Sequence, residues 1–141
     1  MIKKFNYFLN EGYEVLVHND DKRDFVNFLE TELKEKDLSR FWIDIFDWHE
    51  TKEDFDNKKN TRVMIKIVFY NIKNLSFNEY FYNLEIIKNY FQEFDLDIQM
   101  KTEKEKQTLS FFYNDKLKEF YENTEYYHDI KKSRNIKKFK I

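Results

Sequence analysis

In two stretches of this chain the residue type alternates with a period of two, and no other feature constrains the fold as strongly. They are residues 41–48, FWIDIFDW, and residues 62–70, RVMIKIVFY. A period of two is typical of a β-strand with one face in the core, so we expect two long antiparallel neighbours in one sheet. One side of this pair, which we call the core face, is purely apolar and should pack on helices; it holds Phe41, Ile43, Ile45, Val63, Ile65, Ile67 and Phe69.

The other side of the pair, which we call the tryptophan face, mixes large aromatic residues with charges. A buried core disfavours Asp44 and Lys66, and a solvated surface disfavours two tryptophans. We therefore expect something to cover part of this face. Three covers stay open: a helix of this chain, with Asp44 and Lys66 paired at its margin; a protein partner; or stacked RNA bases. In the partner reading, the binding residues are Trp42, Asp44, Phe46, Trp48, Met64, Lys66 and Tyr70.

Helical spacing of apolar residues predicts four helices, and shorter patterns predict the remaining strands. The helices are expected over residues 2–11, with Gly12 as the left-handed cap, over 21–36, over 76–94, and from Asn114 onward. The additional strands are expected at 13–18, 96–100 and 109–113, with a polar turn over 102–106 and an exposed loop over 49–60. This order predicts an α+β fold: a single two-layer sandwich whose antiparallel sheet has the ferredoxin-like order β-α-β-β-α-β, followed by an extra strand and a C-terminal helix.

The charge is divided unevenly along the chain. Residues 1–129 carry 19 basic and 27 acidic residues, whereas residues 130–141 carry six basic residues and no acidic one. We expect one acidic domain over 1–129 and a flexible basic tail over 130–141. Either the tail is only a solvated terminus, or it contacts nucleic acid through Lys131, Lys132, Arg134, Lys137, Lys138 and Lys140.

Several classes of chemistry lack the residues they need. Gly12 is the only glycine, so no glycine-rich loop can cradle phosphates, and the chain has no cysteine for thiol chemistry or thiolate metal sites. The three histidines fall in separate predicted elements without ligand spacing. Asp44, Asp47, His49, Glu50, Glu53 and Asp54 form an acidic cluster that could hold Mg²⁺ or Ca²⁺, but it lacks the spacing of a calcium loop.

These observations predict a non-catalytic binding protein without a cofactor or metal. The abundance of Phe, Tyr, Ile, Asn and Lys indicates an AT-rich genome, and no stretch resembles a signal peptide or reaches the 18 apolar residues of a membrane span. Our specific expectation is a cytoplasmic phage or mobile-element inhibitor of a host nucleic-acid-handling protein, an anti-defence protein of the anti-CRISPR kind. The alternatives are a small RNA-binding module, a metal-dependent enzyme, and a homodimer formed through the exposed aromatic residues.

Overall fold

The computed structural model describes the backbone of residues 12–139 and the side chains of residues 12–135. The predicted opening helix over 2–11 lies outside the described residues. The strands are β1 (Tyr13–Leu16), β2 (Phe41–His49), β3 (Arg62–Tyr70), β4 (Gln99–Glu103) and β5 (Lys106–Phe112). The helices are α1 (Asp20–Glu35), α2 (Lys52–Asn57), α3 (Phe77–Phe91), α4 (Asp115–Glu122) and α5 (Glu125–Phe139), and the short 3₁₀ turns are η1 (Ile72–Asn74) and η2 (Gln92–Phe94).

The five strands form one antiparallel sheet in the order β1-β2-β3-β5-β4, so the predicted α+β class is confirmed. The register of the central pair agrees with the alternation in the sequence: Ile43 lies opposite Ile67, and Asp44 lies opposite Lys66. Residues two apart on each strand share a face, so this register keeps the core face and the tryptophan face apart.

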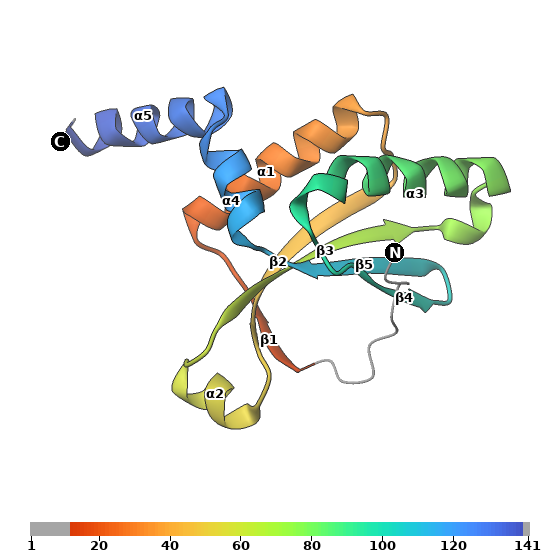
Figure 1. The fold of residues 1–141 in the computed structure, drawn as a ribbon, viewed down its shortest axis with the longest axis horizontal. Coiled ribbons are helices and arrows are strands. Elements are labelled where there is room, and N and C mark those ends of the chain that lie inside the picture. The colour runs from red at the N-terminus through yellow and green to blue at the C-terminus, as the bar shows by residue number, and fades with distance from the viewer. Residues whose placement is uncertain (1–11, 140–141) are drawn as a thin grey trace.

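Helices α1, α3 and α4 lie on one side of the sheet, and α5 extends beyond it (Figure 1). Their apolar stripes meet the core face in one continuous cluster, in which Leu29, Leu33, Ile65, Ile67 and Leu109 are fully buried. The helix α1 matches its prediction within one residue at each end, since Asn19 accepts a hydrogen bond from the Lys22 amide and caps it.

The ferredoxin-like order and the single sandwich are not confirmed. A split βαβ unit joins two parallel strands that have a third strand between them, whereas β1 and β2 are adjacent and antiparallel. The reason is the course of α1. Strand β1 pairs only with the second half of β2, at residues 46–49, and α1 continues in the direction of β1 toward the start of β2 (Figure 1). The chain must then return in the opposite direction.

Three local predictions need correction. The loop over 49–60 contains helix α2, which Thr51 caps by accepting a hydrogen bond from the Asp54 amide. The polar turn over 102–106 is shorter than predicted, because β4 and β5 pair up to Glu103 and Lys106. The last helix is divided into α4 and α5 at residues 123–124, where the Thr124 hydroxyl accepts from the Tyr127 amide and starts a new helix.

The scarcity of glycine shows in the turns. Gly12 has φ +64°, and an added Cβ would lie 2.4 Å from Nε1 of Trp48, so this position needs glycine for its backbone angle and for space. Seven other described residues also have positive φ without being glycine: Asp37, Arg40, Lys58, Asn60, Asn71, Asp95 and Lys104. An L-residue in this region normally costs about 1–2 kcal/mol.

Candidate functional site

The tryptophan face carries a hollow of about 200 Å³ that is lined by strand residues alone. All five strands contribute to it, so the hollow lies across the middle of the sheet. The lining residues are Glu14, Trp42, Asp44, Phe46, Met64, Lys66, Val68, Lys101, Glu103, Lys106, Thr108 and Ser110. Five of these twelve residues, all on β2 and β3, were predicted to bind a partner, and none of the lining residues from β4 and β5 was predicted.

Two exposed aromatic rings stand together on this face. Trp42 and Tyr70 stack with their ring centroids 5.0 Å apart and their planes 28° apart. Trp42 is 39% exposed and Tyr70 is 38% exposed. The indole Nε1 of Trp42 donates to Oδ2 of Asp44 at 3.0 Å, which holds the ring in place. The described helices therefore do not cover this part of the face.

The charged residues of the face are paired differently from the prediction. Lys66 and Asp44 are cross-strand neighbours, but Nζ of Lys66 donates to Oε1 of Glu14 at 2.5 Å, and Asp44 accepts from Trp42 instead. The reason is that β1 brings Glu14 beside the centre of the sheet. At the edge, Lys101 forms an ion pair with Glu103 at 3.0 Å. The acids and bases of the face thus largely neutralise one another.

The far end of the face is more closed. The ring of Trp48 lies 4.9 Å from that of Phe112, and the guanidinium of Arg62 lies 3.5 Å above Phe112. Met64 is only 1% exposed, and Phe46 is half-buried. Of the seven predicted partner-binding residues, Met64 is therefore the least accessible, because its position in the central strand β3 places it beneath its neighbours.

The basic C-terminal residues are engaged with α1 where the structure describes them. Arg134 donates to Asp24 Oδ2 at 2.6 Å and to Asp20 Oδ2 at 3.0 Å, and Lys131 lies 3.7 Å from Asp21. Residues 130–139 belong to helix α5. Lys132 is exposed, the side chains of Lys137 and Lys138 are not described, and Lys140 lies outside the described residues.

The acidic cluster is not assembled into a metal site. In residues 12–139, no group of three or more His, Asp or Glu side chains has the arrangement that a metal ion needs. The side chain of Asp47 pairs with Lys22 at 3.1 Å, and buried His49 places Nε2 2.8 Å from the hydroxyl of Thr61. Both residues are therefore used in local contacts.

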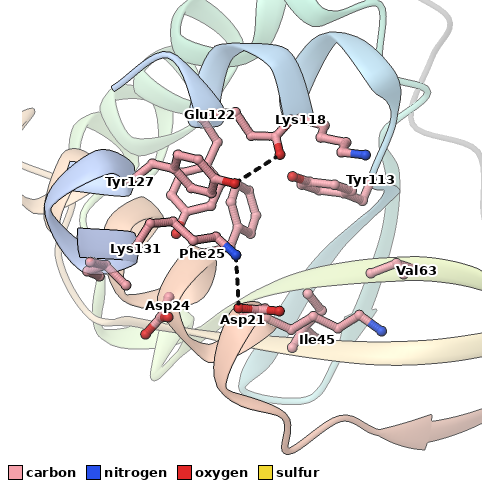
Figure 2. Close-up of a pocket in the computed structure, with 13 residues that line it drawn as sticks. Asp21, Asp24, Phe25, Ile45, Val63, Tyr113, Lys118, Glu122, Tyr127 and Lys131 are labelled. Carbon is pink, nitrogen blue, oxygen red and sulfur yellow. Dashed lines mark hydrogen bonds and ion pairs between the residues drawn. The ribbon is translucent and has the colours of Figure 1, made fainter. Parts of the chain in front are cut away.

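A second cavity escaped the sequence analysis. It has a volume of about 220 Å³ and lies where α1, α4 and α5 meet strands β2 and β3 (Figure 2). Its aromatic lining includes Phe25, Tyr113, Tyr121 and Tyr127. Aromatic residues at helical spacing normally indicate core. Phe25 lies on α1, far in the sequence from the three tyrosines, so no local pattern could reveal the cavity.

Across residues 12–139, no helix is both long and apolar enough to cross a membrane. No protein-family model matches this chain, and neither the curated proteins nor the solved structures contain a match to it.

Proposed function

We propose that this protein acts by binding a protein partner through the tryptophan face. The observation that carries the proposal is the stacked pair of Trp42 and Tyr70, in which both rings stay more than one third exposed and Trp42 lines the hollow of the sheet. Tryptophan and tyrosine are concentrated at the energetic centres of protein interfaces, where they fill pockets of the partner. Folding of this chain does not require two large rings in that position.

The charges of the face favour a protein over a nucleic acid as the partner. Lys66 is paired with Glu14, and Lys101 with Glu103, so two of the three lysines that line the hollow attract phosphate weakly. A protein surface with its own mixture of polar and apolar groups suits such a neutral rim.

The acidic domain supports a more specific proposal. Residues 1–129 contain 27 acidic and 19 basic residues, and Lys131 and Arg134 of α5 neutralise part of this excess at α1. The remaining acidic surface is attracted to basic surfaces such as the grooves that hold nucleic acid. We infer a cytoplasmic inhibitor of a host nucleic-acid-handling protein, for example a CRISPR effector, produced by a phage or mobile element. The AT-rich composition is compatible with such an origin.

The test is capture of partners from a host lysate with matched variants. Trp42→Ala should reduce recovery of a stoichiometric protein partner more than about tenfold, which corresponds to the loss of one interface centre. Tyr82→Ala is the control, because Tyr82 is a 53% exposed ring on α3, away from the tryptophan face. Equal recovery with both variants would contradict the proposal.

A parallel titration with labelled single-stranded RNA distinguishes the RNA-binding alternative. We expect no binding that depends on Trp42 at physiological salt. RNA binding that is lost in both Trp42→Ala and Tyr70→Ala would instead assign the stacked pair to bases, since aromatic stacking supplies much of single-strand affinity.

A further inference from the structure

The cavity between α1, α4 and α5 is walled by aromatic rings set at steep angles to one another (Figure 2). Phe25 lies 4.9 Å from Tyr113 at 76° and 5.1 Å from Tyr121 at 78°. Tyr121 in turn lies 5.2 Å from Tyr127 at 72°. Successive near-perpendicular rings present faces and edges to a shared space, which is the geometry of an aromatic cage.

A carboxylate stands at the side of this cage. Oε2 of Glu122 accepts a hydrogen bond from the Tyr127 hydroxyl at 3.3 Å, and Figure 2 shows the Tyr113 hydroxyl directed toward the same carboxylate. Burial, reinforced by the charge of Glu122, raises the pKa of Tyr113 to about 12. Glu122 therefore acts on both hydroxyls, and in the described part of the chain no lysine or arginine forms an ion pair with it.

The other charges that line the cavity are mostly paired. Asp24 binds Arg134, and Lys22 binds Asp47. Lys118 lies one turn before Glu122 on α4, yet within the described residues the two form no ion pair. Of the carboxylates that line the cavity, Glu122 is thus the one without a basic partner among the described residues, and it is available to a ligand.

The protein already places one of its own ammonium groups at this cavity. Nζ of Lys131 lies 5.5 Å from the ring centroid of Tyr127 and 3.7 Å from Oδ1 of Asp21 (Figure 2). An ion pair of 3.7 Å is long, and Lys131 is exposed, so this contact is weak and can be replaced. An ammonium group therefore already lies beside one ring and one carboxylate of the cavity.

We propose that this cavity binds an organic ammonium group, which contacts the rings of Tyr113, Tyr121 and Tyr127 and the carboxylate of Glu122. The ligand displaces the ammonium of Lys131 from the ring of Tyr127. A volume of about 220 Å³ is below the roughly 300 Å³ at which pockets for drug-sized ligands begin, so it fits a small cationic head. The ammonium can belong to a free amine or to a lysine side chain of a protein.

Calorimetric titration with choline and with 3,3-dimethyl-1-butanol tests the proposal, because the second compound has the same shape without the charge. We expect choline to bind at least about tenfold more tightly, as expected for a cation in a partly desolvated cage. Equal affinity for the neutral alcohol would overturn the proposal and leave only an apolar cavity. Nα-acetyl-lysine methylamide forms the second arm: if it binds more tightly than choline, the natural source of the ammonium is a protein side chain.

Variants on one helix provide the control. Glu122→Gln should weaken choline binding about tenfold, whereas Glu119→Gln, which removes the same charge from an exposed position on α4, should leave it unchanged. Lys131→Ala should strengthen binding, because it removes the internal competitor.

Circular dichroism establishes that each variant is folded. No choline binding by folded wild-type protein and folded Lys131→Ala at tens of millimolar would overturn the proposal. The same holds if Glu122→Gln and Glu119→Gln bind choline equally well.

Discussion

The two faces of the sheet are built from the same strands but follow different rules. On the core face, Ile65 and Ile67 are fully buried beneath helices, and every cross-strand neighbour between β2 and β3 there is apolar, apart from Asp47 at one end. On the tryptophan face, buried Met64 alternates with charged Lys66 and exposed Trp42 lies beside Tyr70. The core face is therefore explained by folding alone, whereas the tryptophan face leaves two large aromatic rings exposed and outside the core cluster.

The largest expected difference concerns two adjacent phenylalanines on opposite faces. Phe111 is 1% exposed and lies 4.8 Å from Phe91 in the core, whereas Phe112 is half-buried on the tryptophan face. Phe111→Ala should lower the free energy of unfolding by about 3–5 kcal/mol, because it leaves a cavity among rigid neighbours. Phe112→Ala should cost about 1–2 kcal/mol, mainly through lost ring contacts. Urea denaturation measures both, and equal costs would contradict the distinction between the faces.

The next effect is alkaline destabilisation from the helix-covered side. Burial raises the pKa of Tyr113 from 10.0 to about 12, and burial also raises the pKa values of Tyr90, Tyr121 and Tyr126. Between pH 10 and 12 the unfolded chain loses these protons before the folded one does, so stability is complete below pH 10 and declines as the pH rises. Urea denaturation over this range should show a flatter decline for Tyr113→Phe. Exposed Tyr82→Phe should follow the wild type.

Gly12→Ala tests the edge where the chain approaches the tryptophan face. The substitution should lower the free energy of unfolding by about 1–2 kcal/mol from its positive φ, and by more from the contact with Trp48. In a Trp48→Ala background only the backbone cost should remain. A thermodynamic cycle of the two substitutions that shows no coupling would mean that Gly12 does not lie against this ring.

The smallest expected effect on stability is that of Trp42→Ala. Because Trp42 is 39% exposed and loses only its stack with Tyr70 and its bond to Asp44, we expect a cost of about 1 kcal/mol or less. Partner recovery, in contrast, should fall strongly. A cost similar to that of Phe111→Ala would make the aromatic pair part of the folding core and weaken the proposed function.

The sequence predicted those parts of the fold in which a local pattern determines the structure. The alternation in 41–48 and 62–70 predicted the central pair and the division of its faces, and Asn19 with the apolar stripe of 21–36 predicted α1. Each of these patterns lies within a single segment of the chain. The alternation also predicted that the aromatic residues of β2 and β3 share the tryptophan face, but not which of them stay exposed.

The remainder depends on contacts between distant segments. The position of β1 decides that Lys66 binds Glu14 rather than Asp44, and it also excludes the expected split βαβ unit. The cavity requires Phe25 of α1 to meet Tyr113 and Tyr127, which lie about a hundred residues later in the chain. Neither result has a signal in the spacing of neighbouring residues, because both are set by how whole elements pack.

The left-handed turns have a consequence for the history of the chain. Asp37, Lys58 and Asn71 have positive φ, a backbone conformation that glycine adopts without steric strain. The codons for glycine are rich in G and C. The composition predicts an AT-rich genome, in which we expect mutation to supply glycine to these turns only rarely. The folded state is therefore less stable than the same backbone would be with glycine at these turns. A descendant in a genome of balanced base content could gain heat resistance by substitutions at the turns alone, with every strand, helix and contact surface unchanged.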